Sequence, residues 1–367
     1  MTIRRRVRLA ALFGLAALAL PEFAAGQAGG PPDTVYYRDR KKDNQVVTVR
    51  GEAKESAKGV EVVVNGKVAV TVSPADMVRV DYGRLPGLAD QDRLGAMTLE
   101  NRDARDAKDL AAARSTYGDL LKAAGGADPK TRKFLEFREA VWAARAADAK
   151  TGTDFRAEAK GAIDKLTAFV RAYPKSWEVW PAATTAARLQ DETDKPNDAA
   201  ATWAGLARNQ DLPAELRYQA RLGELETLLR SNRLNAQSVA DELAKDRNFP
   251  ASGSLREKLT VFQAVLKAPP PKEGAKVPEV KAVEDVIAKT TDPGVRAAAH
   301  NALGEYYLAN NHPREAMWEF LWVETVYNQD RDEVVKAVER LAKVFEQLGD
   351  KDRAEQYREK LPRVKSA

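Results

Sequence analysis

The spacing of apolar residues divides the chain into a short β region and a long helical region. Between Val35 and Tyr82, valines alternate with polar residues, most regularly over residues 59–64 and 67–72. A period of two places alternate side chains on opposite faces of a strand. From about Leu85 onward alanine dominates and apolar residues recur at helical spacing. The sequence therefore predicts a mainly α-helical protein preceded by a small antiparallel β module.

A β-hairpin is predicted where the two alternating stretches meet. Asn65-Gly66 lies between them, and this pair favours a type I′ turn because both central residues need positive φ. A tight turn over residues 73–76 then leads into a last strand. The result is a meander of four or five short strands, whose layout loosely resembles SH3-like and Sm-like barrels.

Breaker residues cut the helical region into segments of ordinary helix length. Proline and glycine recur in AAGGADP, AYPKS, NQDLPAE, RNFPASGS, APPPKEGAKVP and TTDPG. Helix breakers at such regular intervals are typical of repeat proteins. We expect a secretory signal peptide at 1–26, a flexible spacer at 27–34, the β module at 35–84, a linker at 85–100, a helical repeat domain at 101–361 and a tail at 362–367.

The stretch NALGEYYLANNHPREAMWEF carries the clearest repeat pattern. Two helices of a hairpin approach closely only where small side chains meet, while larger residues one turn away fill the space between them. This requirement is met by Leu303-Gly304, Tyr307, Ala316 and Phe320. The pattern resembles the tetratricopeptide repeat at its leucine-glycine, tyrosine, alanine and phenylalanine positions. The second-helix alanine recurs at separations of 34 to 49 residues, at Ala113, Ala162, Ala199, Ala236, Ala282, Ala316 and Ala354.

The resemblance implies an α-solenoid of about five to seven helical hairpins, with a concave groove that binds a protein or an extended peptide. In this family the ligand-facing positions lie on the first helix of each hairpin. They map to Asn301, Glu305, Glu224, Arg188, Glu339 and Lys343. Their mixed charges argue against a dedicated clamp for a peptide's terminal carboxylate, which in this family uses lysines and asparagines.

The first 26 residues have the features of a secretory leader. Arginines at positions 4, 5, 6 and 8 precede an apolar run from Leu9 to Leu20, and small residues follow at 24–26. The run is 12 residues long, short of the ~20 that a membrane-spanning helix needs. We therefore expect an exported protein, periplasmic or secreted, with no transmembrane segment in the mature chain. An uncleaved amphipathic anchor is the alternative.

The net charge of +5 is largely a property of this leader. The first 26 residues contribute +3, because four arginines outweigh Glu22, and the rest of the chain carries +2. A nearly neutral mature chain lacks the basic character of a domain that follows nucleic-acid phosphates. We expect no nucleic-acid partner.

Residues that carry chemistry are few and scattered. The chain has no cysteine, which excludes disulfides, thiolate catalysis and thiolate metal ligands. Its two histidines, His300 and His312, lack the spacing of a zinc site. Glu315 and Glu319 lie one helical turn apart, but in a segment with the form of an ordinary capped, solvated helix. We predict no catalytic residue, metal or cofactor, while a hydrolase with paired carboxylates in the groove stays open as a minor hypothesis.

The segment YYRDRKKDN combines aromatic residues with a basic cluster at Arg38, Arg40, Lys41 and Lys42. On a small barrel this cluster could hold a polyanion. The alternative is an edge strand followed by a solvated loop, in which the lysines prevent edge-to-edge pairing. The six tryptophans likewise suit either a carbohydrate-stacking ladder, with Trp322 the best exposed candidate, or the filling of grooves between helices.

These patterns favour an exported, non-catalytic scaffold that binds a protein or an extended peptide. The alternative function is a cell-envelope protein that binds peptidoglycan or an anionic polysaccharide through the basic cluster and exposed aromatic side chains.

Overall fold

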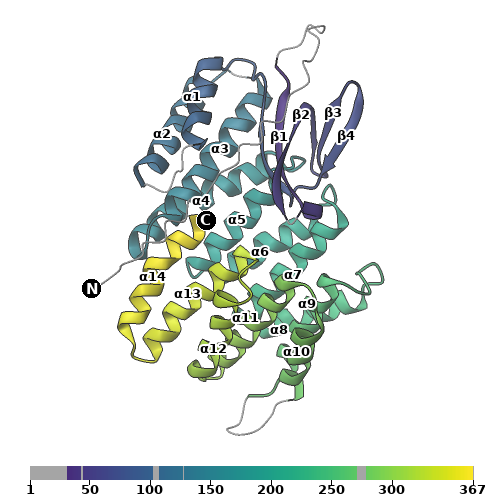
Figure 1. Cartoon of the computed structure of the whole chain (residues 1–367), viewed down its shortest axis with the longest axis vertical. Coiled ribbons are helices and arrows are strands. Elements are labelled where there is room, and N and C mark those ends of the chain that lie inside the picture. Colours follow the sequence, from purple (N-terminus) through teal and green to yellow (C-terminus); the bar gives the residue numbers. More distant parts are fainter. Residues whose placement is uncertain (1–30, 43, 102–106, 127, 271–277, 367) are drawn as a thin grey trace, which may run out of the picture.

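The structure, a computed structural model, describes residues 31–42, 44–101, 107–126, 128–270 and 278–366. The predicted signal peptide and residues 27–30 of the predicted spacer lie outside these residues. Within them, fourteen α-helices follow a five-stranded antiparallel sheet (Figure 1). The predicted fold class, a mainly α-helical protein with a small amino-terminal β module, is confirmed.

The sheet is a meander whose last strand returns beside the first. Its strands are β1 (Asp33–Asp39), β2 (Gln45–Ser56), β3 (Gly59–Val64), β4 (Lys67–Val72) and β5 (Met77–Asp81), with the spatial order β4-β3-β2-β1-β5. The predicted hairpin turn is confirmed, since Asn65 and Gly66 both have positive φ, 52° and 76°.

The long strand β2 pairs with two neighbouring strands. Its first half pairs with β1 and its second half with β3, and the change occurs at Gly51. A Cβ atom at Gly51 would lie 2.5 Å from the backbone oxygen of Val63, so only glycine fits at this crossing without a shift of the backbone.

The helices alternate along the chain in antiparallel neighbours (Figure 1). They are α1 (Asp90–Asn101), α2 (Ala107–Ala123), α3 (Pro129–Asp148), α4 (Gly152–Ala172), α5 (Val179–Glu192), α6 (Pro196–Arg208), α7 (Ala214–Ser231), α8 (Arg233–Lys245), α9 (Ser254–Lys267), α10 (Pro278–Lys289), α11 (Pro293–Ala309), α12 (Pro313–Thr325), α13 (Arg331–Gln347) and α14 (Lys351–Ser366). Helix α1 thus occupies most of the segment predicted as a linker, and α14 continues through most of the predicted tail. None of the described helices has the length and apolar character needed to cross a bilayer.

The predicted alanine anchors fall on the even-numbered helices, which are the second helices of successive hairpins. Six of the seven are buried, with at most 1% of the residue exposed. The prediction is wrong at Ala282 in α10, which is exposed, because the neighbouring Val283 points into the core instead. The register of this hairpin is therefore shifted by one residue.

Small residues set the distance between paired helices, as the sequence predicts. A Cβ atom at Gly304 in α11 would lie 2.5 Å from the ring of Phe320 in α12. A Cβ atom at Gly223 in α7 would likewise lie 2.8 Å from the indole of Trp203 in α6. Both contacts are shorter than carbon atoms tolerate, so an aromatic ring occupies the space that each glycine leaves.

The β module shares a hydrophobic core with the first helices. Val35, Val60 and Val80 belong to the same buried cluster as side chains of α1–α5, and the rings of Tyr82 and Phe134 meet edge to face at 5.6 Å. The module is therefore packed onto the helical array.

A polar cluster beneath this contact ties the sheet to α3 and α5. Lys133 Nζ lies 2.6 Å from a carboxylate oxygen of Glu55 in β2 and 3.2 Å from Glu178, beside Ser176. Burial raises the pKa of the Glu178 carboxyl, and repulsion by Glu55 adds to it, although Lys133 opposes both. The nearly buried lysine is thus the cation that compensates two carboxylates.

The helical array curves until its end meets its beginning. Helix α14 packs on α13 and also lies beside α3, and Figure 1 shows the carboxyl end of α14 next to α4 and α5. The odd-numbered helices α5, α7, α9, α11 and α13 consequently surround a common interior space.

Candidate functional site

A concave groove with a volume of about 1050 Å³ opens into this interior. Its lining comes mainly from α5, α7, α9 and α13, with the start of α11. Because first helices of successive hairpins alternate with outer second helices, their side chains converge on one surface. The concave groove is therefore the principal candidate for a binding site.

Aromatic side chains form an apolar shelf at one end of the concave groove. Trp180 of α5 and Trp203 of α6 meet edge to face at 6.4 Å, and both line the groove together with Tyr218 and Phe262. Gly223 leaves the space in which the Trp203 indole rests. Partly exposed aromatic rings held by their neighbours give a binding surface that loses little entropy on contact.

The rest of the lining is charged, and carboxylates are in excess. Nine acidic and five basic residues line the concave groove, so its net charge is negative. The pKa values of two neighbouring carboxyls at the start of α13, Asp330 and Glu333, shift in opposite directions. Burial and the neighbouring Glu333 raise the pKa of Asp330, although Lys258 opposes this shift. For Glu333 itself, Lys336 and Lys258 outweigh burial and lower the pKa.

The basic cluster of the β module lies at the mouth of this groove. It forms a short 3₁₀ turn, Arg40–Lys42, directly after β1. Arg40 donates to Asp76 at 2.8 Å, lies 3.6 Å from Glu215 of α7 and lines the groove with Asn44. Arg38 lines an adjoining hollow with residues of α13 and α14, whereas Lys41 and Lys42 are exposed.

The interpretation of this segment as an edge strand is wrong. β1 lies between β2 and β5 inside the sheet, because β5 returns beside it after the hairpin. The basic turn is thus held at a fixed place by a central strand, next to the groove, and the two regions that the sequence singled out separately adjoin each other.

The residues mapped as ligand-facing lie on odd-numbered helices, but most of them are paired with other side chains of the protein. Asn301 is only 3% exposed, and its amide donates to the backbone oxygen of Glu333 at 3.0 Å and to its carboxylate at 2.8 Å. Glu305 accepts from Arg340 and lies 3.9 Å from Arg230. Both residues line a smaller cavity of about 280 Å³ between α7, α9, α11 and α13.

The remaining mapped residues are distributed over α5, α7 and α13. Arg188 makes a bidentate contact with Asp148, at 2.7 and 2.8 Å, and lines the concave groove. Glu339 also lines it and lies 2.9 Å from Lys343. Glu224 is buried and pairs with Arg221 outside the groove lining. The structure therefore brings Arg188 and Glu339 into the groove wall and places Glu224 elsewhere.

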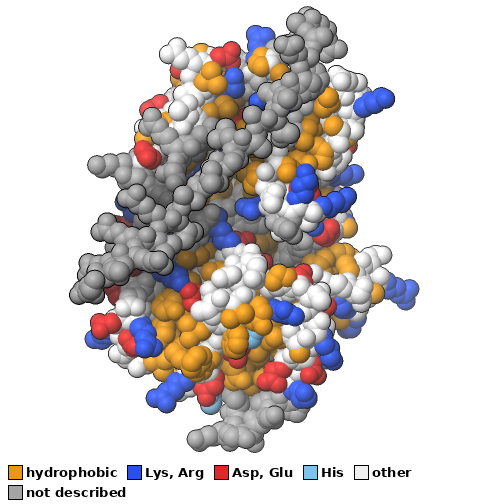
Figure 2. Space-filling view, in the orientation of Figure 1, with side chains coloured by type: hydrophobic (Ala, Val, Ile, Leu, Met, Phe, Trp, Pro, Cys, Tyr) orange, Lys and Arg blue, Asp and Glu red, His pale blue; other side chains and the backbone are white. Residues whose placement is uncertain are grey.

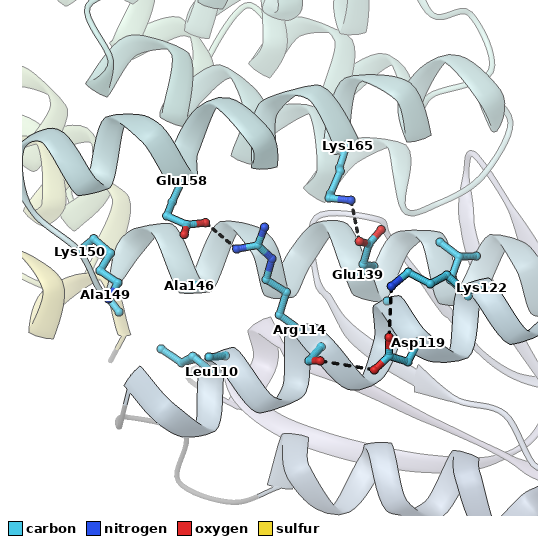
Figure 3. A pocket seen from close by; sticks show the side chains of 14 residues that line it. Leu110, Arg114, Asp119, Lys122, Glu139, Ala146, Ala149, Lys150, Glu158 and Lys165 are labelled. Carbon is cyan, nitrogen blue, oxygen red and sulfur yellow. Dashed lines mark hydrogen bonds and ion pairs between the residues drawn. The ribbon is translucent and has the colours of Figure 1, made fainter.

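A second groove lies on the outer side of the array (Figure 3). It has a volume of about 650 Å³ and runs between α2, α3 and α4. Arg114 of α2 reaches across it to Glu158 of α4 at 2.5 Å, and Lys165 of α4 reaches Glu139 of α3 at 2.6 Å. Because these pairs span the outer groove and it offers no aromatic side chain, the concave groove is the stronger candidate.

The histidines and the paired carboxylates have packing partners. His300 is stacked on Tyr327 and Trp322, and its Nδ1 lies 2.8 Å from Glu319. His312 precedes α12, 3.7 Å from Glu315. Among the described residues, no three histidines or carboxylates are arranged to hold a metal ion.

Sequence reasoning missed Trp180, Trp203 and Tyr218 as groove-lining residues. The sequence leaves the tryptophans open between a carbohydrate-stacking ladder and fillers between helices, and only the fold shows that Trp180 and Trp203 border the groove beside α7. A signal was present in Leu222-Gly223, which repeats the small-residue pattern of Leu303-Gly304 and marks where a large ring approaches.

Comparisons with known families and curated proteins identified no relative of this chain. No model of a known family matches the chain, and no curated protein is similar to it. What is established is an array of helices in hairpins after a small antiparallel sheet.

Proposed function

We propose that this protein is an exported, non-catalytic scaffold of the tetratricopeptide type, periplasmic or secreted, which binds a protein or an extended peptide in its concave groove. The observation that carries the proposal is the groove itself. It is lined by the first helices of successive hairpins and combines an aromatic shelf with a charged wall.

The dimensions and chemistry of the groove support a polypeptide ligand. Pockets for small molecules enclose about 300–1000 Å³; this groove lies at the upper end of that range, is open to solvent, and carries an excess of carboxylates beside its aromatic shelf. An extended peptide presents side chains of both kinds, so it can place apolar groups on Trp180 and Trp203 and polar groups along α13. The basic turn at Arg40 provides a further contact at the groove mouth.

Affinity capture with a blocked groove tests the proposal. In the blocked variant, Thr184→Arg and Gln219→Arg place long side chains in the groove from α5 and α7. The control carries Thr260→Arg and Gln347→Arg, which make the same charge change at exposed sites outside the groove lining. Tagged proteins are cross-linked in cells and the captured proteins identified by mass spectrometry.

We expect parent and control to capture the same protein and the blocked variant to lose it at least tenfold. Equal capture by the blocked variant, with its helical content unchanged, would refute the groove assignment. Asn301 and Glu305 are unsuitable for this test because they hold helices together.

Exposed tryptophans favour a second candidate function, binding of a cell-envelope polymer. Trp318 and Trp322 lie one turn apart on α12 and are 61% and 47% exposed. Hydrophobic side chains gather around a histidine in this part of the molecule (Figure 2). Aromatic faces at this spacing can stack on sugar rings. Cosedimentation with isolated cell-wall material that is lost in a Trp318→Ser, Trp322→Ser variant would support this function, and no cosedimentation of the parent would exclude it.

A further inference from the structure

The contact that closes the helical array is made of ion pairs between segments far apart in the sequence. Lys336 of α13 lies 2.6 Å from Glu226 of α7. Lys343 of α13 lies 4.0 Å from Asp194, in the turn after α5. These two pairs place α13 across the concave groove from α5 and α7.

The last turn of α14 makes the third and most buried contact. Lys365 is enclosed by Glu192 of α5 and by Asp148 of α3, the latter at 3.6 Å, and its side chain is 4% exposed. Its ammonium also lies 4.4 Å from the centre of the Phe155 ring in α4. Arg188 joins the same two carboxylates from the other side.

The charges in these contacts are polarised. All three cations come from α13 and α14, and all four carboxylates come from the segment between α3 and α7. We call this set of residues the lysine seam; it comprises Lys336, Lys343 and Lys365 with Asp148, Glu192, Asp194 and Glu226. One sign on each side is the pattern of two complementary surfaces.

Hydrophobic packing does not cross the lysine seam among the described residues. One buried cluster joins the sheet to α1–α5, and a different one joins α11–α14. The two have no residue in common, and no side chain of α13 or α14 belongs to the clusters that contain α5 or α7. Elsewhere along the array neighbouring helices share apolar cores, which resist separation far more than ion pairs do.

We propose that the lysine seam is a clasp: it holds the array in a closed form, and its release lets α13 and α14 swing away from α3, α5 and α7 while each half keeps its own core. The hinge lies at α11, the helix that contributes side chains both to the core shared with α7 and α9 and to the core shared with α12–α14. The inference concerns the closure of the array and holds whether or not the groove binds a polypeptide.

Neutralising the three lysines tests the clasp. The variant carries Lys336→Gln, Lys343→Gln and Lys365→Gln. The matched control carries Lys122→Gln, Lys175→Gln and Lys281→Gln, which remove the same charge at exposed positions away from the seam. Since the chain has no cysteine, Lys160→Cys in α4 and Glu359→Cys in α14 can be spin-labelled specifically, and the distance between the labels is measured by pulsed electron resonance.

We expect the seam variant to show a longer label distance, by on the order of one helix diameter or about 10 Å, and a larger radius of gyration by X-ray scattering. Control and parent should retain the short distance, and helicity should be equal in all three. An unchanged distance in the folded seam variant would overturn the proposal. Should the seam variant lose its helicity, Lys336→Gln, Lys343→Gln and Lys365→Gln are measured as single variants, where a longer distance in a folded variant supports the clasp and an unchanged distance in all three overturns it.

Discussion

Replacing Gly304 by alanine separates helix packing from helix propensity, because the two predict changes of opposite sign in the free energy of unfolding. In the interior of a helix, alanine is more favourable than glycine by roughly 0.5–1 kcal/mol. At Gly304, however, the added Cβ atom would lie 2.5 Å and 2.6 Å from two ring carbons of Phe320. Carbon atoms prefer about 3.5–4.0 Å, so ring or helix must move by about 1 Å.

The surroundings leave no space for that movement. Phe320 is fully buried, together with Ala316 and Val323 on the same face of α12. Overpacking of such a core costs about 1–3 kcal/mol. After the gain in helix propensity is subtracted, we expect Gly304→Ala to lower the free energy of unfolding by up to about 2.5 kcal/mol.

Urea denaturation followed by circular dichroism measures this change. Gly161→Ala in α4 is the matched control, because a Cβ atom there meets nothing within 4 Å, and it should raise the urea midpoint. Adding Phe320→Leu to Gly304→Ala should recover part of the loss. If Gly304→Ala is as stable as the parent, the close approach of α11 and α12 is not what the glycine provides.

Three further predictions use the same denaturation assay. Lys133→Met should lower stability by about 3–5 kcal/mol, because it leaves Glu55 and Glu178 without their buried cation. Burial raises the pKa of Glu178 above 4.5, so folding favours its protonated form. The contribution of this group to stability should therefore fall as pH rises from about 4.5 through the raised pKa. A contribution that grows over this range would contradict the assignment. Asn301→Ala should cost about 1–3 kcal/mol, because Glu333 loses a buried donor, and an unchanged midpoint would show that the side chain is dispensable for packing.

Local patterns predicted the elements well because the forces that form them are local. Alternating valines and Asn65-Gly66 were sufficient for the hairpin of β3 and β4, since turn geometry depends on two residues. The repeat of small and large residues at Gly304 and Phe320 predicted a hairpin for a similar reason. Ala282 shows the limit of this reasoning, because in an alanine-rich helix a shift of one residue leaves the pattern nearly unchanged.

The site was predicted less well because it depends on contacts across the array. The sequence placed Arg188 and Glu339 on first helices, but it did not show that Glu305 would pair with arginines of α7 and α13 or that Lys343 would reach Asp194. Lys365 and Glu192 are 173 positions apart, so a pattern of nearby residues cannot predict that they form a pair. The sequence alone does not distinguish charged residues that form ion pairs across the array from those that remain exposed, because the pairs form only where the curvature of the array brings two helices together.

The central claim, that the concave groove binds a polypeptide, is tested most directly by site-specific photo-cross-linking in cells. A benzophenone amino acid replaces Tyr218 in the groove, and in a second protein it replaces the exposed Trp318 on α12. The account predicts a discrete protein adduct from position 218 and none of the same mass from position 318. No adduct from position 218, or the same adduct from both positions, would contradict it.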